Sequence, residues 1–250
     1  MLSGCRPGAV RVAYRPVGGD KAAYLITVRS VSTLHVEGRA DEHTDRTTRV
    51  RADHEVLSVG ADGVRVQVVL RVEADRPQTV IVRLDRAEQL VGIEPVPGAS
   101  TAGVDELGVA ELFPAAAGAP PDRPLRPGER WHLDSPVVLP DSTPTRLVGT
   151  GRLDRLSDDG IGHRVATVVS QLRLPVVRRA ESTTGRETVL EGVQITEVTT
   201  MHDLADGTVR AANATTAANY ALRFLPPSGI ERPPTLGTLE LHITSTTERL

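Results

Sequence analysis

The chain has 250 residues, of which 39% are hydrophobic and only 2% are aromatic, and its formal net charge at pH 7 is −3. A chain of this length approaches the upper limit for one hydrophobic core, although all-β domains often reach that size undivided. The slight acidic excess argues against the basic surface that nucleic-acid-binding proteins usually carry, so we expect no nucleic-acid partner. No stretch approaches the run of about 20 apolar residues that a helix needs to cross a bilayer.

The N-terminus holds the single cysteine of the chain in a distinctive setting. Residues Leu2-Ser3-Gly4-Cys5 resemble the lipobox that ends the signal peptide of a bacterial lipoprotein. In a lipobox the peptidase cuts before the cysteine, and small residues before the cut let the enzyme approach the backbone. The cysteine then carries a diacylglycerol, which requires a thiol because the thiolate attacks the lipid donor.

This resemblance predicts lipidation at Cys5 and a flexible tether over residues 1–8. It implies an extracytoplasmic protein that is anchored to the membrane of the cell envelope through its N-terminal lipid. The charged and apolar regions that precede a lipobox are missing before this one, so the interpretation expects them upstream of Met1. The alternative is a chance LSGC sequence in the frayed N-terminus of a cytosolic protein.

Alternation of apolar and polar residues predicts β-strands in the first half of the chain. In residues 64–72 every even position is apolar, and the odd positions are polar apart from Val69. Such a strand buries one face and exposes the other. After a turn at Asp75-Arg76-Pro77, residues 79–85 repeat the pattern.

Further strands are expected before this pair. A strand over about 46–59 is joined to the next one by Ala61-Asp62-Gly63, which is a strong hairpin signal. Tyr24 opens a longer strand, and the apolar residues of 10–14 also alternate with arginines.

The middle of the chain has a different character. Residues 101–113 carry apolar side chains at roughly helical spacing, with Asp105 and Glu106 in the first turn, where the helix dipole favours acidic groups. This pattern predicts one short helical insert, although Gly103 and Gly108 weaken it. Residues 114–128 are rich in Pro, Ala and Gly and are expected to form a loop that crosses the sheet.

The second half again favours strands, expected at about 145–156, 161–174, 187–203, 208–224 and 235–247. Turns are expected at Asp158-Asp159-Gly160 and Ala205-Asp206-Gly207. The stretches 56–63 and 153–160 are similar, since each runs from a strand end into an Asp-Gly turn. The similarity is explained either by an internal duplication or by the general likeness of hairpins. Because neither half has enough strands to close its own core, we expect a single antiparallel β domain over residues 9–250.

Three stretches resemble a known family. Residues 124–131, which read PLRPGERW, look like a Gly-(Asp/Glu)-x-Trp signature of uncharacterised actinobacterial envelope lipoproteins. Tyr14-Arg15-Pro16 followed by Ala23-Tyr24 is similar to their opening strand pair, and residues 191–220 are similar to their closing hairpin.

Those proteins in turn resemble the lipoprotein carriers of the LolA and LppX type. The resemblance implies a mainly β fold in which a long-stranded, strongly curved antiparallel sheet, a half-barrel, wraps an apolar cavity beneath helical lids. It also implies that the cavity holds an acyl chain or another apolar ligand.

One run of residues fits the wall of such a cavity, because small side chains on a concave face leave space. The candidate lining residues are Ala212, Ala214, Thr216, Ala218, Tyr220, Leu222 and Phe224, together with Trp131. The alternative is that this face packs closely against the helix at 101–113. Trp131 has the same two interpretations, as a core residue with a satisfied indole N–H or as a group that stacks on a ligand.

The sequence predicts no catalytic residue, metal or cofactor. The seven histidines form neither an HExxH motif nor a zinc spacing, and the acidic cluster at 41–45 is typical of a solvated turn. His132 with Asp134, and His202 with Asp203, lack a nucleophile in a recognisable frame. We therefore expect a non-catalytic binding module. The alternative is a structural or protein-interaction module at the cell surface without a small-molecule ligand.

Overall fold

The computed structural model describes residues 8–61, 63–72, 76–84, 90–96, 120–137, 144–158, 162, 164–181, 187–226 and 232–250. These residues form eleven β-strands and, within those ranges, no helix. The strands are β1 (Lys21–Val36), β2 (Glu42–Gly60), β3 (Gly63–Val72), β4 (Gln78–Leu84), β5 (Leu90–Pro95), β6 (Arg130–Val137), β7 (Thr145–Asp158), β8 (Arg164–Glu181), β9 (Glu187–Asp203), β10 (Val209–Phe224) and β11 (Thr235–Arg249).

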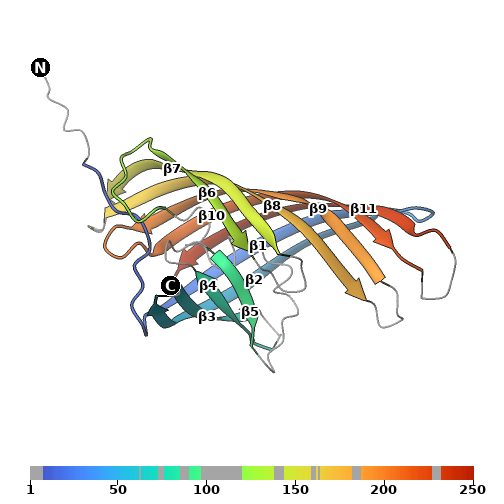
Figure 1. Cartoon of the computed structure of the whole chain (residues 1–250), viewed down its shortest axis with the longest axis horizontal. Helices are drawn as coiled ribbons and strands as arrows, with labels where there is room; N and C mark the ends of the chain where they lie inside the picture. The colour runs from blue at the N-terminus through green and yellow to red at the C-terminus, as the bar shows by residue number, and fades with distance from the viewer. Residues whose placement is uncertain are drawn as a thin grey trace, which may run out of the picture.

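All eleven strands belong to one antiparallel sheet, in the order β5-β4-β3-β2-β1-β11-β10-β9-β8-β7-β6. Neighbouring strands follow each other along the chain, except that the first and last strands, β1 and β11, pair in the middle of the sheet. The two edge strands, β5 and β6, are consecutive in sequence, and the sheet curls until they approach each other (Figure 1). The predicted curved antiparallel half-barrel is therefore confirmed.

The strands differ in length, and this divides the sheet into two parts. The pairing of β3 with β2 ends at Val50, and that of β7 with β8 ends at Arg173. The longer strands continue past these points as a projecting extension, here called the arm (residues 28–36, 42–49, 174–181, 187–196, 216–224 and 235–243). The curled remainder is called the body, and Figure 1 shows the arm extending from it to the right.

The inner face of the body contains the hydrophobic core. The alternation predicted for β3 and β4 is confirmed, because the even-numbered apolar residues of both strands are buried, apart from Val72 at the end of β3, which is half-buried. They pack with Ile26 of β1, Leu133 of β6 and Leu153 of β7 in one continuous cluster. A curved sheet can bury its apolar face against itself, so no second layer is needed to cover this part.

Residues 8–20, here called the N-terminal strap, run along one end of the body before β1 begins (Figure 1). Val10 exchanges two backbone hydrogen bonds of 2.8 Å with Leu125, and the Arg15 N–H donates to the Asp206 carbonyl at 2.8 Å. The prediction of a strand from the alternation of residues 10–14 was wrong. The strap crosses from the segment before β6 to the β9–β10 turn, so it cannot form a ladder with either.

The predicted strands of the second half are confirmed, with one notable extension. β8 continues from the predicted end at residue 174 to Glu181, in spite of Pro175. Beyond Arg173 this strand pairs only with β9, so it is an edge where proline removes no ladder hydrogen bond. The helix predicted at 101–113 lies outside the described residues, as do Cys5 and residues 1–7 of the tether predicted at 1–8.

Candidate functional site

The residues predicted to line a cavity all lie on the inner face of the sheet. Six of them, from Ala212 to Leu222 on β10, are buried, and Phe224 at the end of the strand is half-buried. Ala214, Ala218 and Tyr220 belong to the same core cluster as the inner residues of β3 and β4. Ala214 and Ala218 therefore pack within the core, at the place where the body passes into the arm.

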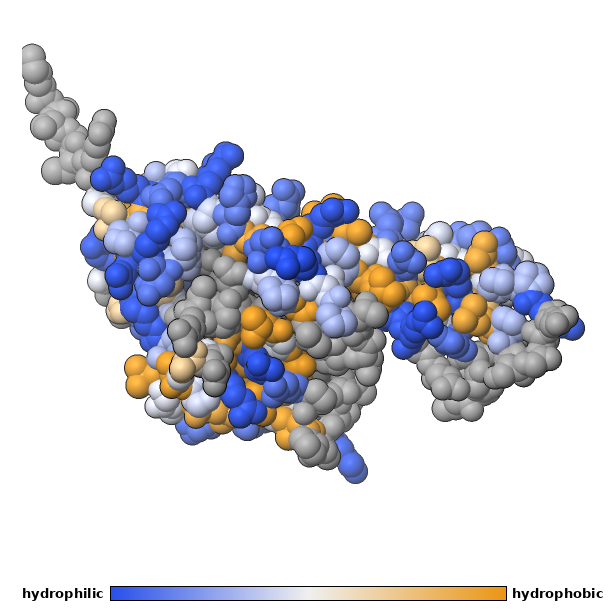
Figure 2. All heavy atoms as spheres, in the orientation of Figure 1, coloured by the Kyte–Doolittle hydropathy of each residue, from blue (hydrophilic) through white to orange (hydrophobic). Residues whose placement is uncertain are grey.

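In the arm the same face continues as an apolar surface that is buried near the body, at Leu174, Val176 and Ile243, and less buried further out. Leu34 of β1, Leu239 of β11 and Tyr220 of β10 lie side by side in one cross-strand row. Several apolar side chains on this face are only half-buried: Leu34, Leu190, Phe224, Leu239 and Leu241, here called the arm wall. Figure 2 shows apolar side chains gathered where the body meets the arm.

Tyr220 stands at the junction of the buried and the half-buried parts of this face. It lies directly opposite Gly192, and a Cβ at position 192 would overlap the Tyr220 ring and the Asn219 carbonyl. The Gln194 amide donates to the Tyr220 hydroxyl at 2.6 Å, and burial raises the pKa of that hydroxyl. Tyr220 is thus held against β9 both at Gly192 and at Gln194.

Trp131 of β6 has a comparable setting. Only 7% of its surface is exposed, and its indole lies over Gly151, its cross-strand neighbour on β7. The sequence contains the signal for this arrangement, a glycine in a strand interior, which often marks the close approach of another group. That signal does not identify the partner, because the register of β6 against β7 is needed for it.

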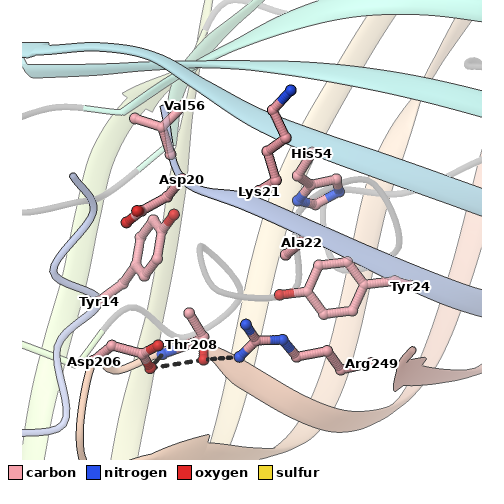
Figure 3. A pocket seen from close by; sticks show the side chains of 10 residues that line it. All are labelled: Tyr14, Asp20, Lys21, Ala22, Tyr24, His54, Val56, Asp206, Thr208 and Arg249. Carbon is pink, nitrogen blue, oxygen red and sulfur yellow. Dashed lines mark hydrogen bonds between the residues drawn. The ribbon is translucent and has the colours of Figure 1, made fainter. Parts of the chain in front are cut away.

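A small pocket lies at the end of the body that the strap closes, and sequence reasoning missed it. Its volume is about 150 Å³. Figure 3 shows side chains from five separate segments around this end pocket. Tyr14 and Asp20 come from the strap, and Lys21, Ala22 and Tyr24 come from β1. The others are His54 and Val56 of β2, Asp206 and Thr208 of the β9–β10 turn, and Arg249 of β11.

Hydrogen bonds hold the strap and the β9–β10 turn rigidly together beside this pocket. The Arg15 guanidinium donates to the carbonyls of Leu204 at 3.1 Å and Ala205 at 2.7 Å. Gly207 has a φ of 76°, and a Cβ there would overlap the Ala13 backbone, so glycine is required for this approach. The wall of the pocket is therefore fixed before any ligand arrives.

Two buried aromatic side chains form the floor of the pocket. Tyr24 and His54 are in contact, with ring centroids 4.8 Å apart. Burial raises the pKa of Tyr24 to about 12 and lowers the pKa of His54 to about 3. Across the whole physiological pH range the phenol therefore keeps its proton and the imidazole stays neutral.

A shallow groove of about 730 Å³ crosses the outer face of β6 to β10. It is lined mostly by polar side chains, among them Arg130, Gln171, Glu197 and Asn213. The Gln171 amide donates to Glu197 at 3.3 Å. Because the groove is open and carries both signs of charge, its chemistry does not single out a ligand.

The histidine–carboxylate pairs considered above have other partners. The Nδ1 of buried His202 lies 3.1 Å from the Gly207 carbonyl and its Nε2 lies 2.8 Å from the Thr200 hydroxyl, while Asp203 accepts from Arg210 at 3.1 Å. Asp134 pairs with Arg146 on the outer face.

The cluster at 41–45 does not converge on one point. His35 bonds to Asp41 at 2.7 Å, and Asp45 accepts two hydrogen bonds from Arg29, which lowers the pKa of the Asp45 carboxyl. No group of side chains suited to a metal ion occurs among the described residues.

No family model matches the chain, and no curated protein is similar to it. Among solved structures it is similar to the in-vitro folded, trimeric form of OmpT, an outer membrane protein of Vibrio cholerae. The sequence identity is 7%, the TM-score is 0.23, and the alignment covers 91% of this chain and 100% of that one. A TM-score of this size does not identify a shared fold. The described residues contain no helix long and apolar enough to span a membrane.

Proposed function

We propose that this protein is a non-catalytic binding module of the cell envelope that holds an apolar ligand, such as an acyl chain, against the arm wall. The observation that carries the proposal is the half-burial of Leu34, Leu239 and Leu241 on a face that continues directly into the core. Contiguous apolar surface of this kind typically marks a binding site in a soluble protein.

The physical argument rests on the single-layered construction of the arm. An amphipathic sheet is stable when its apolar face is covered, and in the body the opposite strands supply that cover. The shorter strands β3 and β7 stop before they reach the arm. An apolar ligand on the arm wall gains about 25 cal/mol for each Å² of apolar surface that it removes from water.

The sequence supports the same proposal independently. The resemblance to envelope lipoproteins of the LolA and LppX type implies an acyl chain on the inner face of a half-barrel. Lipidation of Cys5 would anchor the module to the membrane. His202 and Asp203 bond to the backbone and to Arg210, which supports a role without catalysis.

Native mass spectrometry of protein purified without detergent tests this function. After incubation with oleate, the protein is expected to retain one oleate for each chain, whereas the same treatment with hexanediol is expected to leave the mass unchanged. If no fatty acid is retained at any concentration below its micelle threshold, the proposal is wrong. Co-purification of a stoichiometric protein partner without any amphiphile would favour the structural or protein-interaction alternative.

A further inference from the structure

The end pocket has the features of a preformed polar binding site that is separate from the arm wall. It lies at the row of Tyr24 and Arg249, whereas the arm wall begins several cross-strand rows further along β1 and β11. Its volume of about 150 Å³ corresponds to on the order of five water molecules, so a ligand has to be small.

Tyr24 supplies the first indication of a ligand. Only 5% of its surface is exposed, and its ring is held against His54. Among the described residues none forms a hydrogen bond with its hydroxyl, although buried tyrosines usually have such a partner. Figure 3 shows this hydroxyl directed into the pocket, on the side of Arg249 and Thr208. The group is thus an available donor in a largely desolvated place.

Arg249 and Asp206 supply two opposite charges that do not pair with each other directly. Arg249 Nη1 donates to Thr208 Oγ1 at 2.5 Å, and that hydroxyl donates to Asp206 Oδ1 at 2.7 Å (Figure 3). The Thr208 N–H donates to the same Asp206 oxygen at 2.8 Å. In the part of the chain that the structure describes, Arg249 has no ion pair and Asp206 Oδ2 accepts no hydrogen bond.

The charges around the pocket decide which class of ligand fits. Asp20 and Asp206 balance Lys21 and Arg249, and the neutral His54 adds no charge. Lys21 is paired with Glu55 at 3.4 Å, and Asp20 accepts from the Val17 N–H at 2.8 Å, so Arg249 and Asp206 are the charges available to a ligand. A simple anion would face the Asp206 carboxylate, and a simple cation would face the Arg249 guanidinium.

We propose that the end pocket binds a small zwitterion, an α-amino acid or a molecule of similar size and charge. Its carboxylate accepts hydrogen bonds from Arg249 and Tyr24, and its ammonium group donates to Asp206. His54 holds the Tyr24 ring, and Thr208 bonds to both Arg249 and Asp206, so little ordering is needed on binding. The proposal does not depend on the apolar ligand of the arm wall, because the two sites share no residue.

Titrations followed by NMR test the assignment with three probes: glycine, acetate and methylammonium. In the full chain, glycine is expected to shift the amide signals of residues 206–208 and Arg249 in a saturable manner. Acetate and methylammonium are expected to bind at least about tenfold more weakly, since each lacks one of the two charged groups of glycine. No saturable shift with glycine, or equally tight binding of acetate, would overturn the proposal.

Two substitutions assign the contacts. Tyr24→Phe is expected to weaken glycine binding about tenfold, because it removes one hydrogen bond to a charged group. Tyr220→Phe is the matched control, since its hydroxyl is already bonded to Gln194, and glycine binding should be unchanged. Asp206→Asn keeps the acceptor for Thr208 but removes the charge, so it should weaken glycine binding and strengthen acetate binding. If Tyr24→Phe and Tyr220→Phe bind glycine with the same affinity as the original chain, the zwitterion site is disproved.

Discussion

Trp131 of β6 lies directly opposite Gly151 of β7, and its indole occupies the space that a side chain at position 151 would take. Tyr220 and Gly192 repeat this relationship between β10 and β9. In both pairs an aromatic side chain on the inner face occupies the space that a side chain on the glycine of the next strand would need. The two rings thus fill concave parts of a strongly curved wall where a second bulky side chain has no space.

Gly151→Ala is therefore expected to destabilise the fold by about 1–3 kcal/mol, because the added methyl group displaces a rigid, buried indole. Urea unfolding followed by far-UV circular dichroism measures the change in every variant, including those without the single tryptophan. Gly60→Ala is the matched control, since nothing lies within 4 Å of a Cβ at that position, and its effect should be much smaller. In the background Trp131→Ala the cost of Gly151→Ala should largely disappear. Equal costs in both backgrounds would contradict the packing described here.

Stability is expected to fall as the pH decreases from about 6.5 to about 4. Burial lowers the pKa of His202 to about 4, although its hydrogen bond to the Gly207 carbonyl acts to raise that pKa. Burial also lowers the pKa of His54 to about 3. In this window the unfolded chain takes up protons that the folded chain does not, so the folded state loses about 1.4 kcal/mol per pH unit for each histidine. Denaturant unfolding at several pH values measures the slope.

His202→Asn is expected to reduce that slope by roughly half, since it removes one of the two buried imidazoles while keeping a donor for the Gly207 carbonyl. His132→Asn, on the exposed outer face, should leave the slope unchanged. An unchanged slope in His202→Asn would show that this imidazole takes up its proton equally well in the folded and unfolded states.

The strap is expected to stabilise the closed end of the body. Arg15→Ala removes hydrogen bonds to the carbonyls of Ala13, Leu204 and Ala205, so it should cost about 1–3 kcal/mol. Hydrogen exchange of the amides at 204–208 should accelerate in this variant. Arg11→Ala breaks only an exposed ion pair with Asp122 and should cost less than about 1 kcal/mol. Equal effects of the two substitutions would mean that the strap does not secure the turn.

Much of the strand arrangement follows from local pattern. The alternation in β3 and β4, and the turn residues before β10, predict element type and buried face, because the period of two is imposed by the pleat itself. The pairing of β1 with β11 is not predictable in this way, since it joins the two ends of the chain and leaves no local signal. The edge position of Pro175 likewise depends on where β7 stops.

The candidate site was predicted only in part. The face of β10 is correctly placed inside the sheet, since its small residues alternate with exposed ones. Whether those residues line a cavity stays a prediction. The end pocket was missed because Tyr24, Asp206 and Arg249 are far apart in sequence and are brought together by the β1–β11 pairing and the strap.

Leu239→Gln is expected to lower the amount of retained oleate at least about fivefold, because a polar amide on the arm wall has to be desolvated when an acyl chain binds. Leu236→Gln on the same strand is the matched control, since Leu236 is 45% exposed on the outer rim and lies outside the arm wall. Native mass spectrometry measures both. If the two variants retain the same amount of oleate, the ligand binds elsewhere.

The most direct test of the proposed function is photo-crosslinking of the folded protein with a fatty acid that carries a diazirine in its acyl chain, followed by peptide mapping. Binding on the inner face of the arm predicts adducts on Leu34, Leu239 and Leu241, and competition by unlabelled oleate should remove them. Adducts confined to outward-facing residues, or none above the level of heat-unfolded protein, would contradict the account.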